Sequence, residues 1–272
     1  MASSAILTRP VHAEAGSPAV ECRDLTVRFM SERRSVTALE NVSLTVQESS
    51  FLTVLGPSGC GKSTLLRVIA DIVQPTSGSV RVLGTTPADA RRNRKIGFVF
   101  QDAALLPWRT ALDNVRLPLE VGGRRALPAG AMGPEELLAL VGLAGWEKAL
   151  PHELSGGMRQ RVSIARALLG GPRVLLMDEP FGALDEITRD RLNEELLRIW
   201  RETGTTIVFV THSIYEAAFL GRQVLMLAAG PGRVREIVPV TLPRDRDLSI
   251  RETEPFIRVA ARLRGLLGRG AP

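Results

Sequence analysis

The fold of this chain is decided by the stretch Gly56-Pro57-Ser58-Gly59-Cys60-Gly61-Lys62-Ser63-Thr64. Its spacing, G-x-x-x-x-G-K-S/T, is the pattern of a phosphate-binding loop, the P-loop. An apolar run at 51–55 precedes it and indicates a buried strand, and residues 65–70 continue as the first turns of a helix. A strand, a loop and a helix in this order are the context that the motif requires. The sequence therefore predicts nucleotide binding.

The residue types in this loop suit a polyphosphate. Glycines allow backbone angles that a Cβ would obstruct, so consecutive N–H groups can turn towards the anion. The helix that begins near Lys62 directs the positive end of its dipole at the same point. We expect the Lys62 ammonium to reach the β- and γ-phosphates, Ser63 to ligate Mg²⁺, and Thr64 to donate a hydrogen bond to the phosphates.

Length, cysteine usage and charge narrow the class of protein. The 272 residues suffice for one large domain or two small ones with a buried core. Cys22 and Cys60 lie far apart, which fits a reducing cytosol better than a disulfide framework. No stretch approaches about 18 uninterrupted apolar residues, so we expect no membrane span. The net charge is +6, but the arginines are scattered without interleaved aromatic residues, which argues against nucleic-acid binding.

The chain before the P-loop divides into a tail and two strands. Residues 1–18 are small and polar and lack a positive start followed by an apolar core, so we expect a disordered tail and not a signal peptide. Residues 19–30 and 36–47 have the alternation of strands, and they predict a small antiparallel sheet ahead of the P-loop strand. Phe29 ends the first of these strands in this interpretation.

Beyond the P-loop the pattern changes twice. Residues 102–169 become helical with glycine- and proline-rich breaks, so we expect a helical subdomain inserted between strands of a sheet. One helix is expected at 135–143 and another at 156–169. Residues 244–272 form a basic tail whose segment 252–268 is amphipathic. We expect this helix to pack on its own domain and not on a membrane surface.

Polar side chains stand where two buried strands end. The apolar strand at 173–178 ends in Asp178, which Glu179 follows. In an open α/β sheet, ligands bind at this edge, so Asp178 is the expected Mg²⁺ ligand and Glu179 can polarise a water for attack. A solvated strand end is the alternative for this acidic pair. His212 follows the strand at 205–210, where a catalytic and a structural role are equally open.

Phe29 also has two interpretations. The sequence alone favours a half-buried aromatic residue of a strand. The functional alternative is a stacking platform for a nucleotide base.

A second anion-binding device lies far along the chain, in Leu154-Ser155-Gly156-Gly157-Met158-Arg159-Gln160-Arg161. It combines a serine and two glycines at a helix N-terminus. This run resembles the ABC signature. Together with the P-loop and Asp178-Glu179, it makes the chain resemble the ATP-binding subunits of ABC transporters over about residues 19–243. The resemblance implies an α/β fold, a P-loop NTPase core of ABC type with an N-terminal antiparallel β-subdomain and an inserted helical subdomain. It also implies two copies paired head to tail, each signature closing over the other copy's ATP.

The resemblance assigns roles to single residues. It implies that Gln101 senses the γ-phosphate and Mg²⁺, that Asp178 is the Walker B aspartate, and that Glu179 is the catalytic carboxylate. By the same likeness His212 is the switch histidine that acts with Glu179 in catalysis.

Other positions bind nucleotide by the same resemblance. Phe29 falls where the family stacks an aromatic ring on adenine, usually a tyrosine. Asp185 ends the D-loop at 182–185, which faces the partner copy, and residues 155–157 contact the partner's ATP. Met158 departs from the commoner glutamine of the signature, but methionine occurs there in one importer subgroup.

Four stretches, at 100–109, 180–185, 211–217 and 230–234, resemble ATPases of nitrate, sulfonate and taurine importers. This likeness implies ATP and Mg²⁺ as cofactors and a place at the cytoplasmic face of the inner membrane. It implies as partners two transmembrane permeases and a second ATP-binding subunit, which we expect to be an identical copy, although a paralogue stays open. A periplasmic or lipid-anchored substrate-binding protein would act indirectly. The alternatives are a soluble ABC ATPase of DNA repair or translation, or an exporter subunit.

Overall fold

The computed structural model describes residues 18–31, 34–121, 127 and 130–268. The strands are β1 (Pro18–Ser31), β2 (Arg34–Gln47), β3 (Phe51–Leu55), β4 (Ser77–Val82), β5 (Ile96–Val99), β6 (Val174–Asp178), β7 (Thr206–Thr211), β8 (Gln223–Ala228) and β9 (Arg233–Pro239). The helices are α1 (Lys62–Ile69), α2 (Pro87–Arg92), α3 (Ala111–Val121), α4 (Pro134–Leu140), α5 (Gly156–Leu168), α6 (Glu186–Thr203), α7 (Ile214–Leu220) and α8 (Glu254–Gly268), with short 3₁₀ turns η1 (Pro151–Glu153) and η2 (Leu248–Glu252). The tail expected at 1–18 lies outside the described residues, except that Pro18 already begins β1.

The larger sheet places the ends of the key strands together. Its order is β5-β6-β7-β3-β8-β9, and all strands are parallel except β9. The register pairs Leu55 with Thr211 and Asp178 with Val210. The P-loop, the acidic end of β6 and the end of β7 therefore meet at one edge of the sheet.

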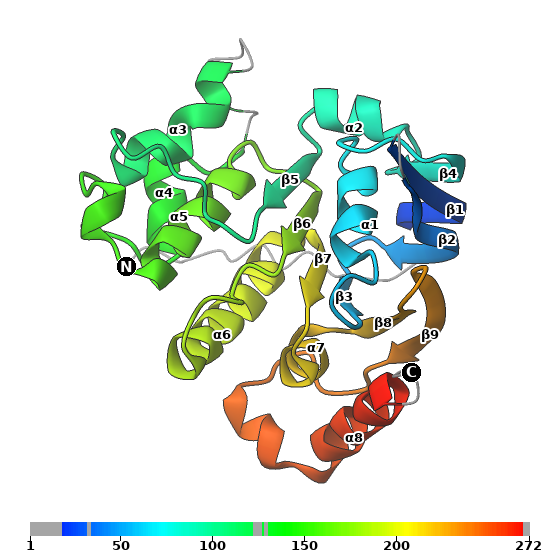
Figure 1. Ribbon diagram of the computed structural model, residues 1–272. Coiled ribbons are helices and arrows are strands. Elements are labelled where there is room, and N and C mark those ends of the chain that lie inside the picture. Colours follow the sequence, from blue (N-terminus) through cyan, green and yellow to red (C-terminus); the bar gives the residue numbers. More distant parts are fainter. Residues whose placement is uncertain (1–17, 32–33, 122–126, 128–129, 269–272) are drawn as a thin grey trace.

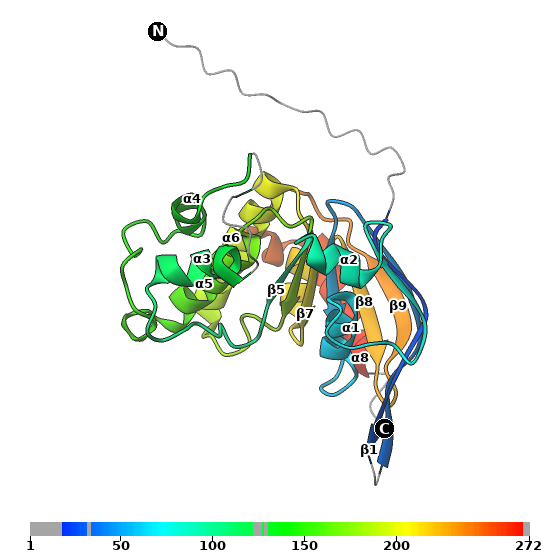
Figure 2. The same cartoon turned by 90° about the horizontal axis from the view of Figure 1, so that it is seen from above.

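A second sheet lies beside the first, with the antiparallel order β2-β1-β4 (Figures 1 and 2). The strands β1 and β2 agree with the pair expected from the sequence. Two details differ. The first strand does not end at Phe29 but continues to Ser31, because Phe29 pairs with Val36 and the ladder runs on to the next two residues. The strand β4 joins this sheet as the neighbour of β1, a pairing that the sequence did not indicate.

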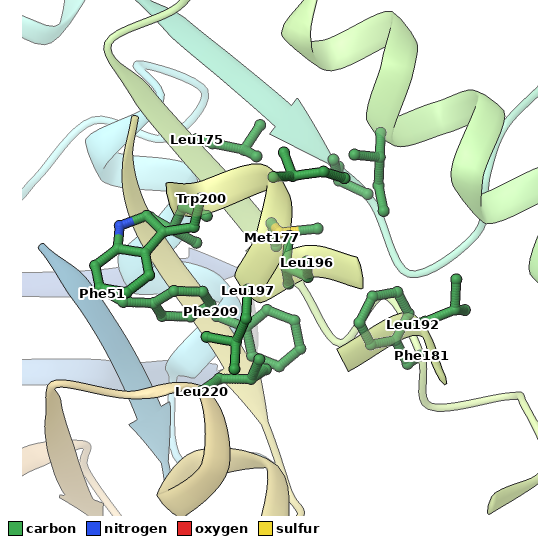
Figure 3. Packing of buried hydrophobic residues seen from close by; sticks show 14 of the residues in the cluster. Phe51, Leu175, Met177, Phe181, Leu192, Leu196, Leu197, Trp200, Phe209 and Leu220 are labelled. Carbon is green, nitrogen blue, oxygen red and sulfur yellow. The ribbon is translucent and has the colours of Figure 1, made fainter. Parts of the chain in front are cut away.

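The larger sheet has a hydrophobic layer on each face. Side chains alternate along a strand, so Val174 and Leu176 pack with α1 and the small sheet, whereas Leu175 and Met177 face the helices α5 to α8. On that second face, Trp200 of α6 meets Phe51 edge to face, with ring centroids 5.6 Å apart (Figure 3). Both layers are buried, which keeps the parallel strands fixed beneath the P-loop.

Helices α3, α4 and α5 form the insertion between β5 and β6, on the side of the sheet away from the small antiparallel sheet (Figure 1). The helical pattern does not begin at once, since residues 101–110 form turns and irregular structure. Helix α4 ends at Leu140 and not at 143, because Gly142 takes a φ of +69° and breaks the helix. The structure also contains α2 and α7, which the sequence analysis did not predict.

The C-terminal helix α8 packs on the same domain, as expected. Phe256, Ala260 and Leu263 are buried in the layer that includes α7 and β8. Ile257 is an exception, because 56% of it stays exposed on the outer side of the helix. Of the helices in the described ranges, none has the length and apolar character needed to cross a bilayer.

Candidate functional site

The P-loop runs from the end of β3 to the start of α1, and its neighbours hold its shape. A Cβ on Gly56 would lie 2.7 Å from the backbone oxygen of Leu227, so no side chain fits there. Gly61 has a φ of +95°, and a Cβ on it would lie 2.6 Å from the backbone oxygen of Ala38. Both positions therefore require glycine, one for space and the other for space and conformation.

The Lys62 side chain is buried across this loop. Its ammonium donates hydrogen bonds to the backbone oxygens of Gly56 (2.9 Å) and Pro57 (3.0 Å). The lysine starts helix α1, so the positive end of the helix dipole points at the same place. A buried ammonium and a helix N-terminus that converge on one loop fit a polyphosphate anion.

The remaining P-loop residues divide by exposure. Ser58 and Gly59 form the exposed tip of the loop, and Thr64 is half-buried in the first turn of α1. Cys60 is buried, and this burial raises the pKa of its thiol. Cys60 therefore packs as a neutral thiol, with its sulfur 2.7 Å from the point that a Cβ on Gly56 would occupy.

A hydroxyl and a carboxylate meet beside the P-loop. Ser63 donates a hydrogen bond of 2.7 Å to Oδ1 of Asp178, which is only 7% exposed at the end of β6. Burial raises the pKa of this carboxyl group, although the bond from Ser63 opposes that shift. Hydroxyl and carboxylate oxygens side by side are ligands that suit Mg²⁺, which usually takes one or two carboxylates together with phosphate oxygens.

Glu179 and His212 face each other at the same edge. Nδ1 of His212 lies 3.3 Å from Oε2 of Glu179, and Oε1 of Glu179 lies 3.8 Å from Nζ of Lys62. The backbone of Glu179 has a φ of +45°, which is uncommon for a residue other than glycine, and its N–H donates to the oxygen of Val210. The carboxylate is thus aimed between the P-loop lysine and the histidine, where it can polarise a water molecule.

Gln101 approaches this group from the end of β5. A Cβ built on Gly182 would lie 3.7 Å from Cε1 of His212 and 3.9 Å from Nε2 of Gln101. The glutamine amide and the histidine ring therefore border the same point on the D-loop. The backbone oxygen of Gln101 also accepts a 2.7 Å hydrogen bond from the buried side chain of Gln160 on α5.

The signature serine and the D-loop aspartate cap two neighbouring helices. Ser155 accepts a hydrogen bond from the Met158 N–H at the start of α5, and Asp185 accepts one from the Thr188 N–H at the start of α6. These hydrogen bonds at the start of α6 lower the pKa of Asp185.

Residues 155–157 are not brought to the P-loop of their own chain. Both overall views place α5 and α1 on opposite sides of β5 (Figures 1 and 2). Within the described ranges, no hydrogen bond or ion pair joins residues 155–157 to residues 56–64. In this chain, residues 155–157 and the P-loop therefore lie at separate places of the described structure.

Phe29 lies on the strand pair that borders the P-loop. Phe29 is 47% exposed, and it pairs with Val36, which lies two residues before Ala38, the residue whose backbone oxygen crowds Gly61. This exposure leaves part of the aromatic side chain accessible to a ligand, which suits the stacking interpretation.

Two contacts with the site were not found from sequence. The turn after β8 brings Gly232 against Cys60 of the P-loop, and Gln160 binds the backbone of Gln101. Both contacts join residues more than fifty positions apart, so no local pattern indicates them. The only signal at Gly232 was the glycine-rich stretch 230–234.

Comparison with known proteins decides the family. A family model described as ABC transporter matches residues 39–182, which contain the P-loop, the signature and Asp178-Glu179. The chain belongs to the ABC transporter family. As an ATP-binding subunit of this family, the protein hydrolyses ATP in a reaction coupled to transport.

Relatives of this ABC ATPase cover most of the chain. An aliphatic sulfonates import ATP-binding protein of Bacillus subtilis is 46% identical over 223 residues, which span 80% of this chain and 84% of the relative. A taurine import ATP-binding protein of Rhizobium johnstonii is 50% identical over 203 residues, 74% of this chain and 76% of the relative.

A solved structure agrees with the fold of this ABC ATPase. A dimeric ATP-binding cassette in a post-hydrolysis state, bound to ADP and Pi, superposes with a TM-score of 0.70 at 34% identity and covers 82% of this chain and 100% of the solved one.

Proposed function

We propose that this ABC ATPase powers the import of a sulfonate, such as taurine or another aliphatic sulfonate, with nitrate as the next candidate. The identity of 46–50% to sulfonate and taurine import subunits supports this assignment. Two copies would dock beneath two transmembrane permeases at the cytoplasmic face of the membrane. A separate substrate-binding protein would deliver the solute.

The proposed chemistry rests on the side chains that meet at the edge of the larger sheet. The main observation is the 2.7 Å hydrogen bond between Ser63 and Asp178. Ser63 and Asp178 would hold Mg²⁺, with Gln101 nearby, and the metal would neutralise charge on the phosphates. Lys62 and the P-loop backbone would bind the phosphates, and Phe29 would stack on adenine.

Hydrolysis is proposed to depend on Glu179. Its carboxylate would polarise the attacking water, and His212, 3.3 Å away, would hold the carboxylate in place. Residues 155–157 and Asp185 would complete the site of the second copy, and the position of residues 155–157 away from the P-loop of their own chain supports this.

A glutamine substitution tests the hydrolytic role. We expect Glu179→Gln to retain ADP affinity but to lower the ATPase rate by about 10² or more, because general base catalysis contributes roughly 10²–10⁴ in rate. Glu202→Gln, at the far end of α6, is the matched control and should keep wild-type turnover. A Glu179→Gln variant with near-normal turnover would refute the assignment.

A growth assay tests the transported solute. A strain that lacks this protein should fail to grow on taurine or on a longer alkanesulfonate as sole sulfur source, or on nitrate as sole nitrogen source. Growth should return with the wild-type gene and not with Glu179→Gln. Normal growth of the deletion strain on every one of these compounds would contradict the proposed solute class and leave the ATPase assignment intact.

A further inference from the structure

The segment 243–256, which we name the C-terminal clamp, contacts the side of α6 and both ends of α7. Its most buried contact is Arg246, whose guanidinium donates to the backbone oxygens of Phe219 (2.6 Å), Leu220 (3.0 Å) and Gly221 (3.0 Å). These are the last carbonyl groups of α7, which have no partners within the helix. Burial lowers the pKa of Arg246 to about 10, and a desolvated guanidinium is tolerated only when its donors are satisfied.

A second arginine of the clamp binds α6. Arg251 forms a two-pronged ion pair with Asp190, with both nitrogen-to-oxygen distances at 2.7 Å. Paired N–H donors facing a carboxylate fix direction as well as distance. The Leu248 N–H adds a 3.0 Å bond to Glu194 one turn further along α6. The Arg251 guanidinium also lies 5.3 Å from the ring centroid of Phe219 on α7, so one side chain touches both helices.

The end of the clamp holds α7 from its side. Phe256, at the start of α8, stacks on Tyr215 with ring centroids 6.2 Å apart and an angle of 11°. Tyr215 is the second residue of α7. The clamp therefore grips α7 near its first turn and at its last carbonyl groups.

The two clamped helices begin at residues of the proposed site. Asp185 caps α6, and Ser213, which directly follows His212, caps α7. Helix α7 has 7 residues and thus a length of about 10 Å. We therefore expect a displacement of its C-terminal end to reach its N-terminal end, where His212 directly precedes the capping residue Ser213.

We propose that Arg246 and Arg251 are positioning residues for hydrolysis, because the clamp sets His212 relative to the D-loop helix α6. This inference rests on the roles proposed for Glu179 and His212. The clamp touches neither the P-loop nor Phe29 through any hydrogen bond or ion pair within the described ranges. It should therefore act on the rate of hydrolysis and not on nucleotide affinity.

The test uses the full chain with Arg251→Gln, which removes the ion pair and keeps most of the side-chain volume. We expect kcat to fall about threefold to tenfold, which lies within the range of indirect coupling through packed networks, with KM for ATP and the ADP dissociation constant unchanged. Nucleotide-binding stoichiometry corrects kcat for any unfolded fraction. Arg258→Gln is the matched control, since among the described residues Arg258 pairs only with Glu254, in an exposed ion pair within α8. That variant should keep wild-type kcat.

Charge exchange separates positioning from a general loss of stability. The double variant Asp190→Arg with Arg251→Asp restores the pair with its charges reversed, so it should recover most of the lost kcat. The C2 proton resonance of His212 should shift in Arg251→Gln and return in the double variant. An unchanged kcat in Arg251→Gln, or a rise in KM of the same size as the fall in kcat, would refute the positioning role that we propose for the clamp.

The failures of the two proposals are distinguishable. If Glu179→Gln is inactive while Arg251→Gln has wild-type kcat, only the positioning role proposed for the clamp is wrong. If Glu179→Gln retains full activity, the proposed hydrolytic roles are wrong, whatever the clamp variants do.

Discussion

The turn after β8 offers a direct test of how the P-loop is supported. Gly232 donates its N–H to the Ala38 oxygen (3.0 Å) and accepts from the Glu40 N–H (2.9 Å), which fixes the turn against β2. A Cβ at this position would lie 2.1 Å from the backbone oxygen of Cys60 inside the P-loop. The φ of Gly232 is not positive, so Gly232→Ala would be opposed by the lack of space and not by the backbone angle.

The expected magnitude follows from that distance. A separation of 2.1 Å cannot persist, so either the turn or the P-loop must move. Forcing an extra carbon into a well-packed site costs about 1–3 kcal/mol. The hydrogen bonds to β2 hold the turn in place, so we expect the P-loop to move. The free energy of nucleotide binding should then become less favourable by this amount. Since about 1.4 kcal/mol corresponds to a tenfold change, Gly232→Ala should weaken ADP binding by roughly 5-fold to 150-fold.

Calorimetric titration of the full chain with ADP measures this effect directly. The matched control is Gly265→Ala in α8, where a Cβ would have no neighbour within 4 Å, and it should bind ADP like the wild type. A Gly232→Ala protein that binds ADP within twofold of wild type but melts at a lower temperature would refute the reasoning. In that case the turn moves to accommodate the added Cβ, and the P-loop keeps its conformation.

Two further predictions concern stability. Burial raises the pKa of the Asp178 carboxyl group, so the ionised carboxylate destabilises the fold at pH values above that pKa. In the absence of Mg²⁺ and nucleotide, the Asp178→Asn variant should therefore melt at or above the wild-type temperature at neutral pH. Any advantage should vanish as the pH falls through the raised pKa, and a lower melting temperature at neutral pH would contradict it. Gly204 ends α6 with a φ of +62°, so Gly204→Ala should lower the free energy of unfolding by about 1–2 kcal/mol in urea denaturation. A loss below about 0.3 kcal/mol would show that the helix end relaxes.

Much of the fold follows from local patterns in the sequence. The buried strands β3, β6 and β7 are mainly apolar runs, and each leads directly into a glycine-rich or polar stretch that marks its end. Asp178, Glu179 and His212 could be placed at one edge of the sheet, because parallel strands that carry ligands share that edge. Their convergence in the structure agrees with this expectation.

Other elements had no clear periodicity. Helix α7 buries Glu216 and the four residues that follow it, so it has no polar face to reveal a helical period. Helix α2 has six residues and buries only Ala90, too little for an apolar stripe.

The contacts of Gly232 and Arg246 depend on tertiary structure. Arg246 reaches carbonyl groups 25 to 27 positions earlier in the chain, and an arginine in a basic tail looks like surface charge. No local pattern distinguishes it from the exposed arginines around it.

The place of the helical insertion has an evolutionary consequence. The chain leaves the larger sheet after Val99 and rejoins it at Val174, on directly neighbouring strands. A segment inserted between two adjacent strands can change in length and sequence without altering the order of any other strand. Divergence of α3 and α4 can therefore create a new outer surface while the half of the molecule that holds ATP is inherited unchanged. Gene exchange restricted to this segment is a route by which one ancestral ATPase could serve many transport systems.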